Sequence, residues 1–171
     1  MSFLVKRQSW SRFGVKAAVV FLLITVFWLV FKSRFSIGID TQLVKCIPGY
    51  TVYLIDKHDK TLIKDEIFVV LSSGLNPIYE DGTQLVKYLR GEPGDLIEIK
   101  DNHNIYVDGE FQGHGLSHSQ TLHSSPESYM GSRTLKADEY WFMGISDRSF
   151  DSRYWGSASS EQVYGKAYPI F

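Results

Sequence analysis

The sequence predicts a mainly β domain preceded by one N-terminal transmembrane helix. Two observations lead to this prediction. An apolar run without any charge covers residues 17–31. Behind it, short alternating or β-branched segments are separated by turn residues, and no long amphipathic helical period competes with them. A length of 171 residues suits one compact domain with an extra element.

The composition argues against several classes of protein. The chain has 18 basic and 19 acidic side chains, so its net charge of −1 argues against a nucleic-acid partner bound by bulk electrostatics. Hydrophobic residues make up 44% of the chain, which is enough to bury a core. The single cysteine, Cys46, cannot form an intramolecular disulfide. Its thiol is therefore a small buried hydrophobe, a partner for another chain or a nucleophile.

The apolar run has the length of a membrane anchor. Extended to residues 13–31, it would form a helix of roughly 28 Å, close to a hydrocarbon thickness of about 30 Å. A cleavable signal peptide and a buried core helix are the alternatives. The sequence KSRF at residues 32–35 replaces a small-x-small cleavage site, and no polar face interrupts the run. We expect residues 13–34 to be a retained transmembrane anchor.

The flanking charges predict the orientation of this anchor. Four basic residues precede the run and only two follow it closely; they are Lys6, Arg7, Arg12 and Lys16, then Lys32 and Arg34. The positive-inside rule then makes residues 1–12 a cytoplasmic N-terminus. We expect a single-pass protein of the bacterial inner membrane, with residues 38–171 forming a periplasmic domain.

The exported part contains five segments that are expected to be strands. They cover residues 50–56, 67–71, 96–99, 104–107 and 139–143. The segment 104–107 and Phe111 flank Asp108-Gly109-Glu110, which predicts a β-hairpin. At most short helices are expected. Residues 112–133 are rich in Gly, Ser, His and Thr, so they form either an exposed loop or an excursion over a binding site.

Three histidines lie in that polar stretch. His114 and His118 are four residues apart and could share one helix face as metal ligands, with His123 nearby. The glycines and serine around them disfavour a helix, and no carboxylate has a suitable local spacing. We therefore expect neither a metal nor another cofactor. Nothing local supports a pairing of Cys46 with a histidine, as in cysteine proteases.

Three other blocks contain residues suited to chemistry. KCIPGY at residues 45–50 follows the anchor closely. VKYLRGEPGD at residues 86–95 presents Lys87 on an apolar strand that ends in a tight turn. GISDRSFDSRYWG at residues 144–156 combines small, charged and aromatic residues in one loop. Each block alone is ordinary, so only their combination and order carry information.

In this order, the three blocks resemble the signal peptidase I family, which processes exported proteins with a serine–lysine dyad. The most specific element is DSRYWG at residues 151–156, followed by KxxxGxPGD at residues 87–95. VYGKA at residues 163–167 resembles the closing strand of the family. The single span and CxPGY at residues 46–50 resemble the TraF-type peptidases of conjugative transfer. Members of that group mature pilin subunits, in some cases by joining the ends of the pilin into a ring.

The resemblance implies roles for five residues. Lys87 would be the general base, and Cys46 stands where the family has its nucleophilic serine. A lysine can act as a base only when it is neutral, and burial disfavours the ammonium form. Ser149 resembles the serine that orients the lysine, and Asp151 and Arg153 resemble a charge pair that stiffens the site. A purely structural role for these supporting residues is an equal alternative. Backbone N–H groups, including that of Cys46, would hold the oxyanion.

The sequence departs from the family at the nucleophile. A thiol is a better nucleophile than a hydroxyl and ionises nearer neutrality, so a Cys–Lys pair is chemically competent. A thioester is also more open to attack by an amine, so we expect Cys46 to favour transpeptidation or cyclisation over hydrolysis. Val44 replaces a serine that donates to the oxyanion in leader peptidases, and residues 144–149 are one residue shorter than usual.

Three classes of function compete. The first is a processing peptidase or cyclase that acts on an exported precursor such as a pilin, next to the lipid bilayer. The second is an inactive relative retained as a membrane-tethered assembly or substrate-binding factor. The third, a thiol redox protein, lacks a Cys-x-x-Cys pair. Retention of Lys87 favours the first, since an inactive protein gains nothing from the cost of burying a lysine.

Overall fold

The structure is a computed structural model that describes residues 9–171. The described chain divides into two compact units, the first ending at residue 35 and the second comprising residues 36–171. The cytoplasmic N-terminus expected at residues 1–12 lies mostly outside the described residues.

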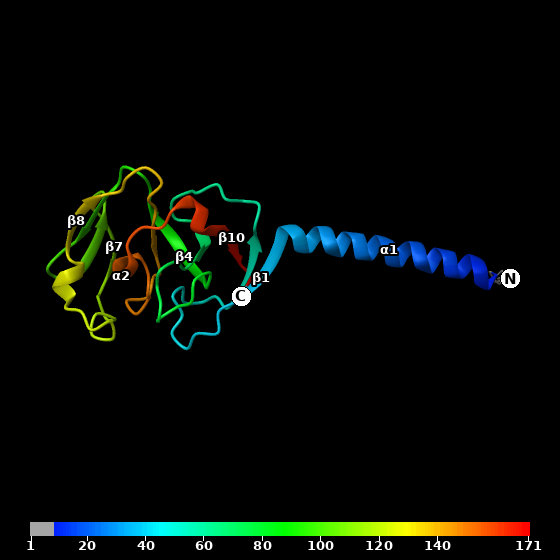
Figure 1. Ribbon diagram of the computed structural model, residues 1–171, viewed down its shortest axis with the longest axis horizontal. Helices are drawn as coiled ribbons and strands as arrows, with labels where there is room; N and C mark the ends of the chain where they lie inside the picture. The colour runs from blue at the N-terminus through cyan, green and yellow to red at the C-terminus, as the bar shows by residue number, and fades with distance from the viewer. Residues whose placement is uncertain (1–8) are drawn as a thin grey trace, which may run out of the picture. The chain divides into compact units, whose positions relative to one another are not determined.

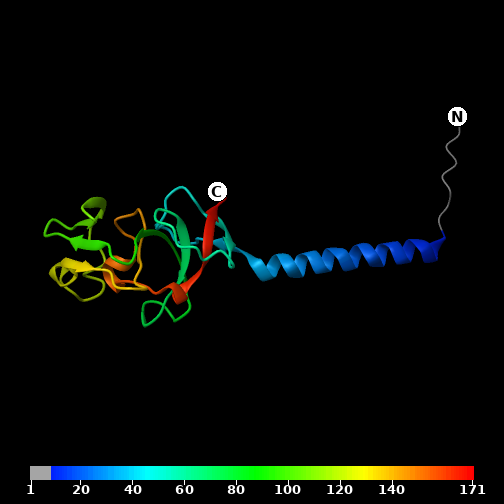
Figure 2. The ribbon, with the colours of Figure 1, turned by 90° about the horizontal axis from the view of Figure 1, so that it is seen from above.

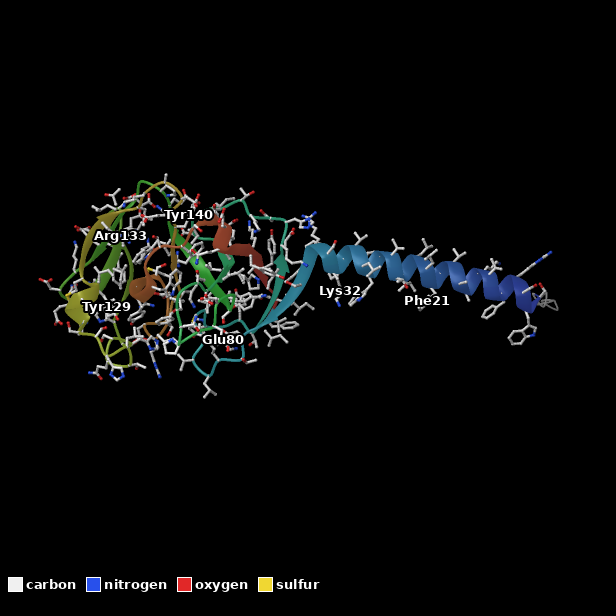
Figure 3. The ribbon with its side chains drawn as sticks, in the orientation of Figure 1. Phe21, Lys32, Glu80, Tyr129, Arg133 and Tyr140 are labelled. Atoms are coloured by element: carbon white, nitrogen blue, oxygen red, sulfur yellow. The ribbon has the colours of Figure 1, made fainter. Side chains whose placement is uncertain are left out.

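The first unit contains the helix α1, Trp10–Arg34, which is 25 residues long. It begins three residues before the anchor predicted from the sequence and ends at the same residue. Its most apolar window has a mean hydropathy of 2.4, so length and composition suit a membrane span, and no other helix in residues 9–171 meets both conditions. Phe21 and Lys32 project from this helix in Figure 3. The hydroxyl of Thr25 donates to the carbonyl of Phe21 at 2.9 Å, which satisfies a polar group on an otherwise apolar surface.

The second unit contains two antiparallel sheets. The larger sheet has six strands in the order β1-β2-β10-β3-β4-β9. Their bounds are β1 Phe35–Ile39, β2 Val52–Asp56, β10 Val163–Pro169, β3 Ile67–Leu71, β4 Gln84–Gly91 and β9 Trp141–Met143. The last strand, β10, therefore lies between β2 and β3 and pairs antiparallel with both. The predicted strand at residues 67–71 is confirmed, and the predicted strands 50–56 and 139–143 each begin two residues later than expected.

The smaller sheet has four strands in the order β7-β6-β5-β8. Their bounds are β7 Glu110–His114, β6 Asn104–Val107, β5 Leu96–Ile99 and β8 Gly131–Thr134. The predicted hairpin is confirmed, because β6 and β7 pair around Asp108 and Gly109. Both turn residues have positive φ, 49° and 80°, as a two-residue hairpin turn requires.

Residues 112–133 are only partly irregular. They include the end of β7, the short 3-10 helix η1, Pro126–Tyr129, and most of β8. All four residues of β8 are exposed, and the strand forms because its backbone pairs with β5, Leu96 opposite Thr134. The sequence pattern missed this strand because its side chains carry no buried alternation.

The remaining helices of the second unit are short. They are α2, Ser152–Trp155, and the 3-10 helices η1 and η2, the latter at Ser160–Gln162. Figures 1 and 2 both show α2 between the two sheets, where it contacts β9. The mainly β prediction is confirmed.

The alternation of side chains along β4 places a lysine in the core. Leu85, Lys87 and Leu89 are all buried, while the residues between them are partly exposed. In the antiparallel register, Lys87 lies opposite Phe68 of β3. Lys87 therefore occupies an interior position of β4, where an apolar side chain would be usual.

Candidate active site

Cys46 lies in the irregular segment between β1 and β2. The next residue, Ile47, is buried in a cluster with Tyr53 and Ile55 of β2, which anchors the segment to the larger sheet. The carbonyl of Cys46 accepts hydrogen bonds from the N–H groups of Ile145 at 2.9 Å and Ser146 at 3.3 Å. The loop that follows β9 thus fixes the backbone at Cys46.

Lys87 and Cys46 meet in the interior, although they are 41 residues apart in sequence. The Lys87 Nζ atom lies 2.8 Å from the Cys46 Sγ atom. Lys87 is 2% exposed and Cys46 is 9% exposed. Within residues 9–171, the thiol is the only hydrogen-bond partner of the lysine side chain. This is the contact that a base needs in order to take a proton from a nucleophile.

Gln42 provides a second neighbour for the thiol. Its Oε1 atom lies 3.5 Å from the Cys46 Sγ atom, and its Nε2 atom lies 3.5 Å from the hydroxyl of Tyr79. Gln42 was not predicted as a site residue from the sequence. Its spacing of four residues before Cys46 is the only local signal, and in an irregular segment such spacing predicts no contact.

Asp151 and Arg153 form a buried ion pair. The Arg153 Nε atom donates to Asp151 Oδ1 at 2.8 Å, and Nη2 donates to Oδ2 at 2.7 Å. Both side chains are buried. Burial alone would lower the pKa of Arg153, but the hydrogen bonds and charge of Asp151 outweigh it and raise this pKa above its ordinary value. Such a two-point contact holds both side chains in one geometry.

This ion pair also holds the loop that supports Cys46. Asp151 Oδ2 accepts a hydrogen bond from the N–H of Gly144 at 2.9 Å. The Arg153 Nη2 atom donates to the carbonyls of Ser146 at 2.9 Å and Ser149 at 3.3 Å. Residues 144–149 are therefore tied to the pair at both ends. If Asp151 and Arg153 stiffen the site, as predicted, they would do so through their hydrogen bonds to the backbone of this loop.

The polar stretch after β7 docks on the same loop. Arg153 Nη1 donates to the carbonyls of His114 and Gly115, each at 3.2 Å. The His118 Nε2 atom lies 2.7 Å from the carbonyl oxygen of Arg148. His114 therefore lies at the end of β7, where its carbonyl contacts Arg153. His118 lies in a turn, where its ring contacts the backbone of Arg148. These contacts lie on the supporting loop, and no residue of 112–133 lines the pocket that contains Cys46, so both expectations for this stretch stay open.

Ser149 is completely buried close to the backbone of Cys46. A Cβ atom placed on Gly144 would overlap the hydroxyl of Ser149 and lie 2.7 Å from the carbonyl oxygen of Cys46. Only glycine therefore fits at residue 144, a requirement that the sequence did not reveal. Among residues 9–171, the Ser149 hydroxyl has no hydrogen-bond partner. It thus makes no hydrogen bond to Lys87, the residue that the resemblance assigns to it.

A donor for an oxyanion is available at Cys46 itself. Within the described residues, its backbone N–H donates to no acceptor. Val44 is exposed and offers no side-chain donor at the position where leader peptidases have a serine. The backbone N–H of Cys46 could therefore contribute to an oxyanion hole without breaking a hydrogen bond.

A pocket of about 190 Å³ opens at the thiol. Cys46 and Lys87 both line it, so the reactive atoms face a space that a ligand can enter. Its other walls combine apolar and polar side chains, among them Ile39, Ile55, Leu85, Asp40, Thr41 and Gln42.

The chain is similar to known proteins in three comparisons. The family model described as signal peptidase, peptidase S26, matches residues 7–171. A curated relative, the probable signal peptidase I-2 of Synechocystis, is 28% identical over 88 residues, which cover 50% of this chain but only 37% of the relative. A crystal structure of a signal peptidase I from Enterococcus faecalis is 25% identical with a TM-score of 0.39, covering 61% of this chain and 94% of that one. Because the family model matches nearly the whole chain, this protein belongs to the signal peptidase family, peptidase S26.

Proposed function

We propose that this protein is a membrane-anchored endopeptidase that cuts an exported precursor with a Cys46–Lys87 dyad. The observation that carries the proposal is the distance of 2.8 Å between Lys87 Nζ and Cys46 Sγ, at the wall of a pocket. Membership of the signal peptidase family supports the reaction class. The helix α1 would be the anchor, with the N-terminus in the cytoplasm and the domain from residue 38 in the periplasm, as the flanking charges predict.

The first chemical step joins the substrate to the thiol. Neutral Lys87 takes the proton of Cys46, and the sulfur attacks the carbonyl carbon of the scissile bond. The N–H of Cys46 donates to the oxygen that becomes negative. When the tetrahedral intermediate collapses, Lys87 gives its proton to the leaving amine. The products of this step are the released amine and a thioester on Cys46.

The second step decides the product. Water attacking the thioester would give a linear, hydrolysed product: Lys87 takes a proton from the water, the C–S bond breaks, and Lys87 returns the proton to the Cys46 sulfur. An amine of the same substrate would instead close a ring. We propose that Cys46 favours the amine, and that the substrate is a conjugative pilin, because CxPGY at residues 46–50 resembles TraF-type peptidases.

The buried lysine favours this enzyme over an inactive tethering factor. Burial of an amine costs free energy unless its hydrogen bonds are replaced, and the only replacement at Lys87 within residues 9–171 is the thiol. An assembly factor that does no chemistry would be more stable with an apolar side chain at this position.

The test uses the full chain reconstituted in lipid vesicles with candidate pilin precursors. We expect Cys46→Ala to abolish processing and Lys87→Ala to slow it by roughly 10²–10⁴-fold, the usual contribution of a general base. Lys136→Ala, at an exposed lysine, is the control and should leave the rate unchanged. Retained processing in Cys46→Ala would contradict the dyad.

Mass spectrometry of the product tests the second step. A product lighter than the linear fragment by one water indicates ring closure. Cys46→Ser should shift the product towards the linear form, because an oxygen ester resists amine attack better than a thioester does. A purely linear product from the wild-type enzyme would contradict the cyclisation proposal and leave the peptidase proposal standing.

A further inference from the structure

The pocket at the thiol has an anionic group in its wall. Asp40 follows β1 directly, and its N–H donates to the carbonyl of Thr51 at 2.8 Å, which fixes its backbone. One carboxylate oxygen accepts from the N–H of Gln42 at 3.0 Å. Both Asp40 and Gln42 line the same pocket as Cys46 and Lys87. A carboxylate therefore borders the space that a substrate must enter to reach the dyad.

Asp40 has no cationic partner in the part of the chain that the structure describes. The side-chain amines of Lys45 and Lys87 bond to other groups. Lys45 donates to the hydroxyl of Thr51, and Lys87 donates to the thiol of Cys46. The negative charge of Asp40 is thus not neutralised by an ion pair within the protein.

The charge of Asp40 reaches the buried side chains around the thiol. Burial is the main reason why the pKa of Tyr53 rises to about 12, and the charge of Asp40 is the next. The pKa of Tyr79 is also raised, chiefly by burial, with contributions from Cys46 and Asp40. Both phenols resist ionisation partly because this carboxylate is near, so its field extends into the site.

The walls of the pocket suit a long cationic side chain. Ile55 and Leu85 offer apolar surface to the hydrocarbon stem of a lysine or arginine, and Asp40 offers an acceptor to its charged end. A small apolar residue in the same place would displace water from the carboxylate and give it no partner, which costs free energy. A basic substrate residue therefore gives the Asp40 carboxylate a partner, whereas a small apolar residue leaves it desolvated and unpaired.

We propose that Asp40 makes this pocket a subsite for a lysine or arginine side chain of the substrate, next to the scissile bond. That the bound side chain belongs to a peptide substrate rests on the proposed peptidase function. The preference of the pocket for a cation does not. Asp40 acts as a specificity determinant and takes no part in the bond-breaking steps.

Thiol chemistry tests the charge of the pocket without any substrate. Cys46 is the only cysteine, so thiol reagents modify the full chain at this site alone. The rates of modification by aminoethyl, sulfonatoethyl and methyl methanethiosulfonate would be compared in neutral detergent micelles. The ratio of the cationic to the anionic rate reports the local potential, because a change in the reactivity of the thiol itself cancels in the ratio.

We expect the wild-type ratio to exceed the ratio for a free thiol, and Asp40→Asn to lower it by roughly tenfold. Asp40→Glu should restore most of the preference. Asp101→Asn, which removes an exposed carboxylate from the turn between β5 and β6, is the matched control and should leave the ratio unchanged. An unchanged ratio in Asp40→Asn would overturn the proposal.

A peptide library tests the substrate residue. Wild-type enzyme should cut peptides enriched in lysine or arginine at one position relative to the cut, and Asp40→Asn should lose this enrichment while still cutting peptides that are neutral there. Cleavage without a basic preference would overturn the proposed subsite and leave the peptidase function intact. If wild-type enzyme cut no peptide at all, the peptidase function would fail, and the thiol rates would still decide whether the pocket selects cations.

Discussion

The two halves of the candidate dyad are held in different ways. Lys87 lies in the middle of β4, where the pairing with β3 and β9 fixes its position by regular backbone hydrogen bonds. Cys46 lies in an irregular segment, and its carbonyl is held by two N–H groups of the loop after β9. That loop depends in turn on the Asp151–Arg153 pair. Lys87 is thus positioned by a sheet, and Cys46 by a series of side-chain and loop contacts.

This difference predicts where the site is vulnerable. Strand register changes only in whole-residue steps, so moderate substitutions leave Lys87 in place. The loop at residues 144–149 holds Cys46 and is itself held by Asp151 and Arg153. A single substitution in the loop or in this ion pair can therefore move Cys46. A displacement of about 1 Å at a reacting atom can cost roughly 10²-fold in rate. Three substitutions test the comparison.

Arg153→Met should have the largest effect. It leaves the Asp151 carboxylate buried without its partner and releases the carbonyls that Arg153 holds. We expect the free energy of unfolding to fall by about 3–5 kcal/mol, the usual cost of breaking a buried ion pair from one side. Chemical denaturation of the full chain in micelles measures this change.

The control for this prediction lies in the same loop. Arg148→Ala removes an exposed arginine and should change stability by no more than about 0.5 kcal/mol. The double variant Asp151→Asn with Arg153→Met should be less destabilised than Arg153→Met alone, because no charge is then left unpaired. Equal losses of unfolding free energy in Arg153→Met and Arg148→Ala would show that the Asp151–Arg153 pair does not support the loop.

Gly144→Ala should have an intermediate effect on stability and a larger one on the site. The new Cβ would overlap the Ser149 hydroxyl and press on the Cys46 carbonyl. Overpacking of this kind costs about 1–3 kcal/mol. Since the carbonyl belongs to the nucleophile, we expect processing and alkylation of Cys46 to change more than the stability does.

Ser149→Gly provides the matching rescue for this variant. It removes the Cβ and hydroxyl that the alanine would strike, so Gly144→Ala with Ser149→Gly should recover part of the lost stability. It should not recover all of it, because the contact with the Cys46 carbonyl remains. A Gly144→Ala variant with wild-type alkylation kinetics would show that the loop does not position the nucleophile.

The same contrast explains what could be predicted from the sequence. The strands at residues 67–71, 96–99 and 104–107 were identifiable because a β-branched run, an alternating pattern or an Asp-Gly turn is present in the local sequence. The strand β8 was not, since its exposed residues become a strand only through pairing with β5. Local patterns therefore predict elements that bury a face, and miss those held by backbone pairing alone.

The site divides in a similar way. Cys46 and Lys87 could be predicted as site residues because the sequence blocks that contain them follow the order found in the family. Asp40 and Gln42 are ordinary polar residues, and their place at the thiol depends on how the segment after β1 folds back. The need for glycine at residue 144 arises from contact with a carbonyl about a hundred residues earlier in the chain, which no local pattern encodes.

Ser149→Ala should have the smallest effect on stability and separates packing from positioning. The Ser149 hydroxyl is buried without a hydrogen-bond partner, which disfavours the folded state by about 1–3 kcal/mol. Its removal should leave the free energy of unfolding unchanged or raise it by up to about 1 kcal/mol. Proteins retain such groups where they serve a function, so we expect processing to slow several-fold while the fold remains intact. This split would mark Ser149 as a residue that contacts Lys87 or the substrate only during the reaction, whereas unchanged processing would mean that it only fills space beside Gly144.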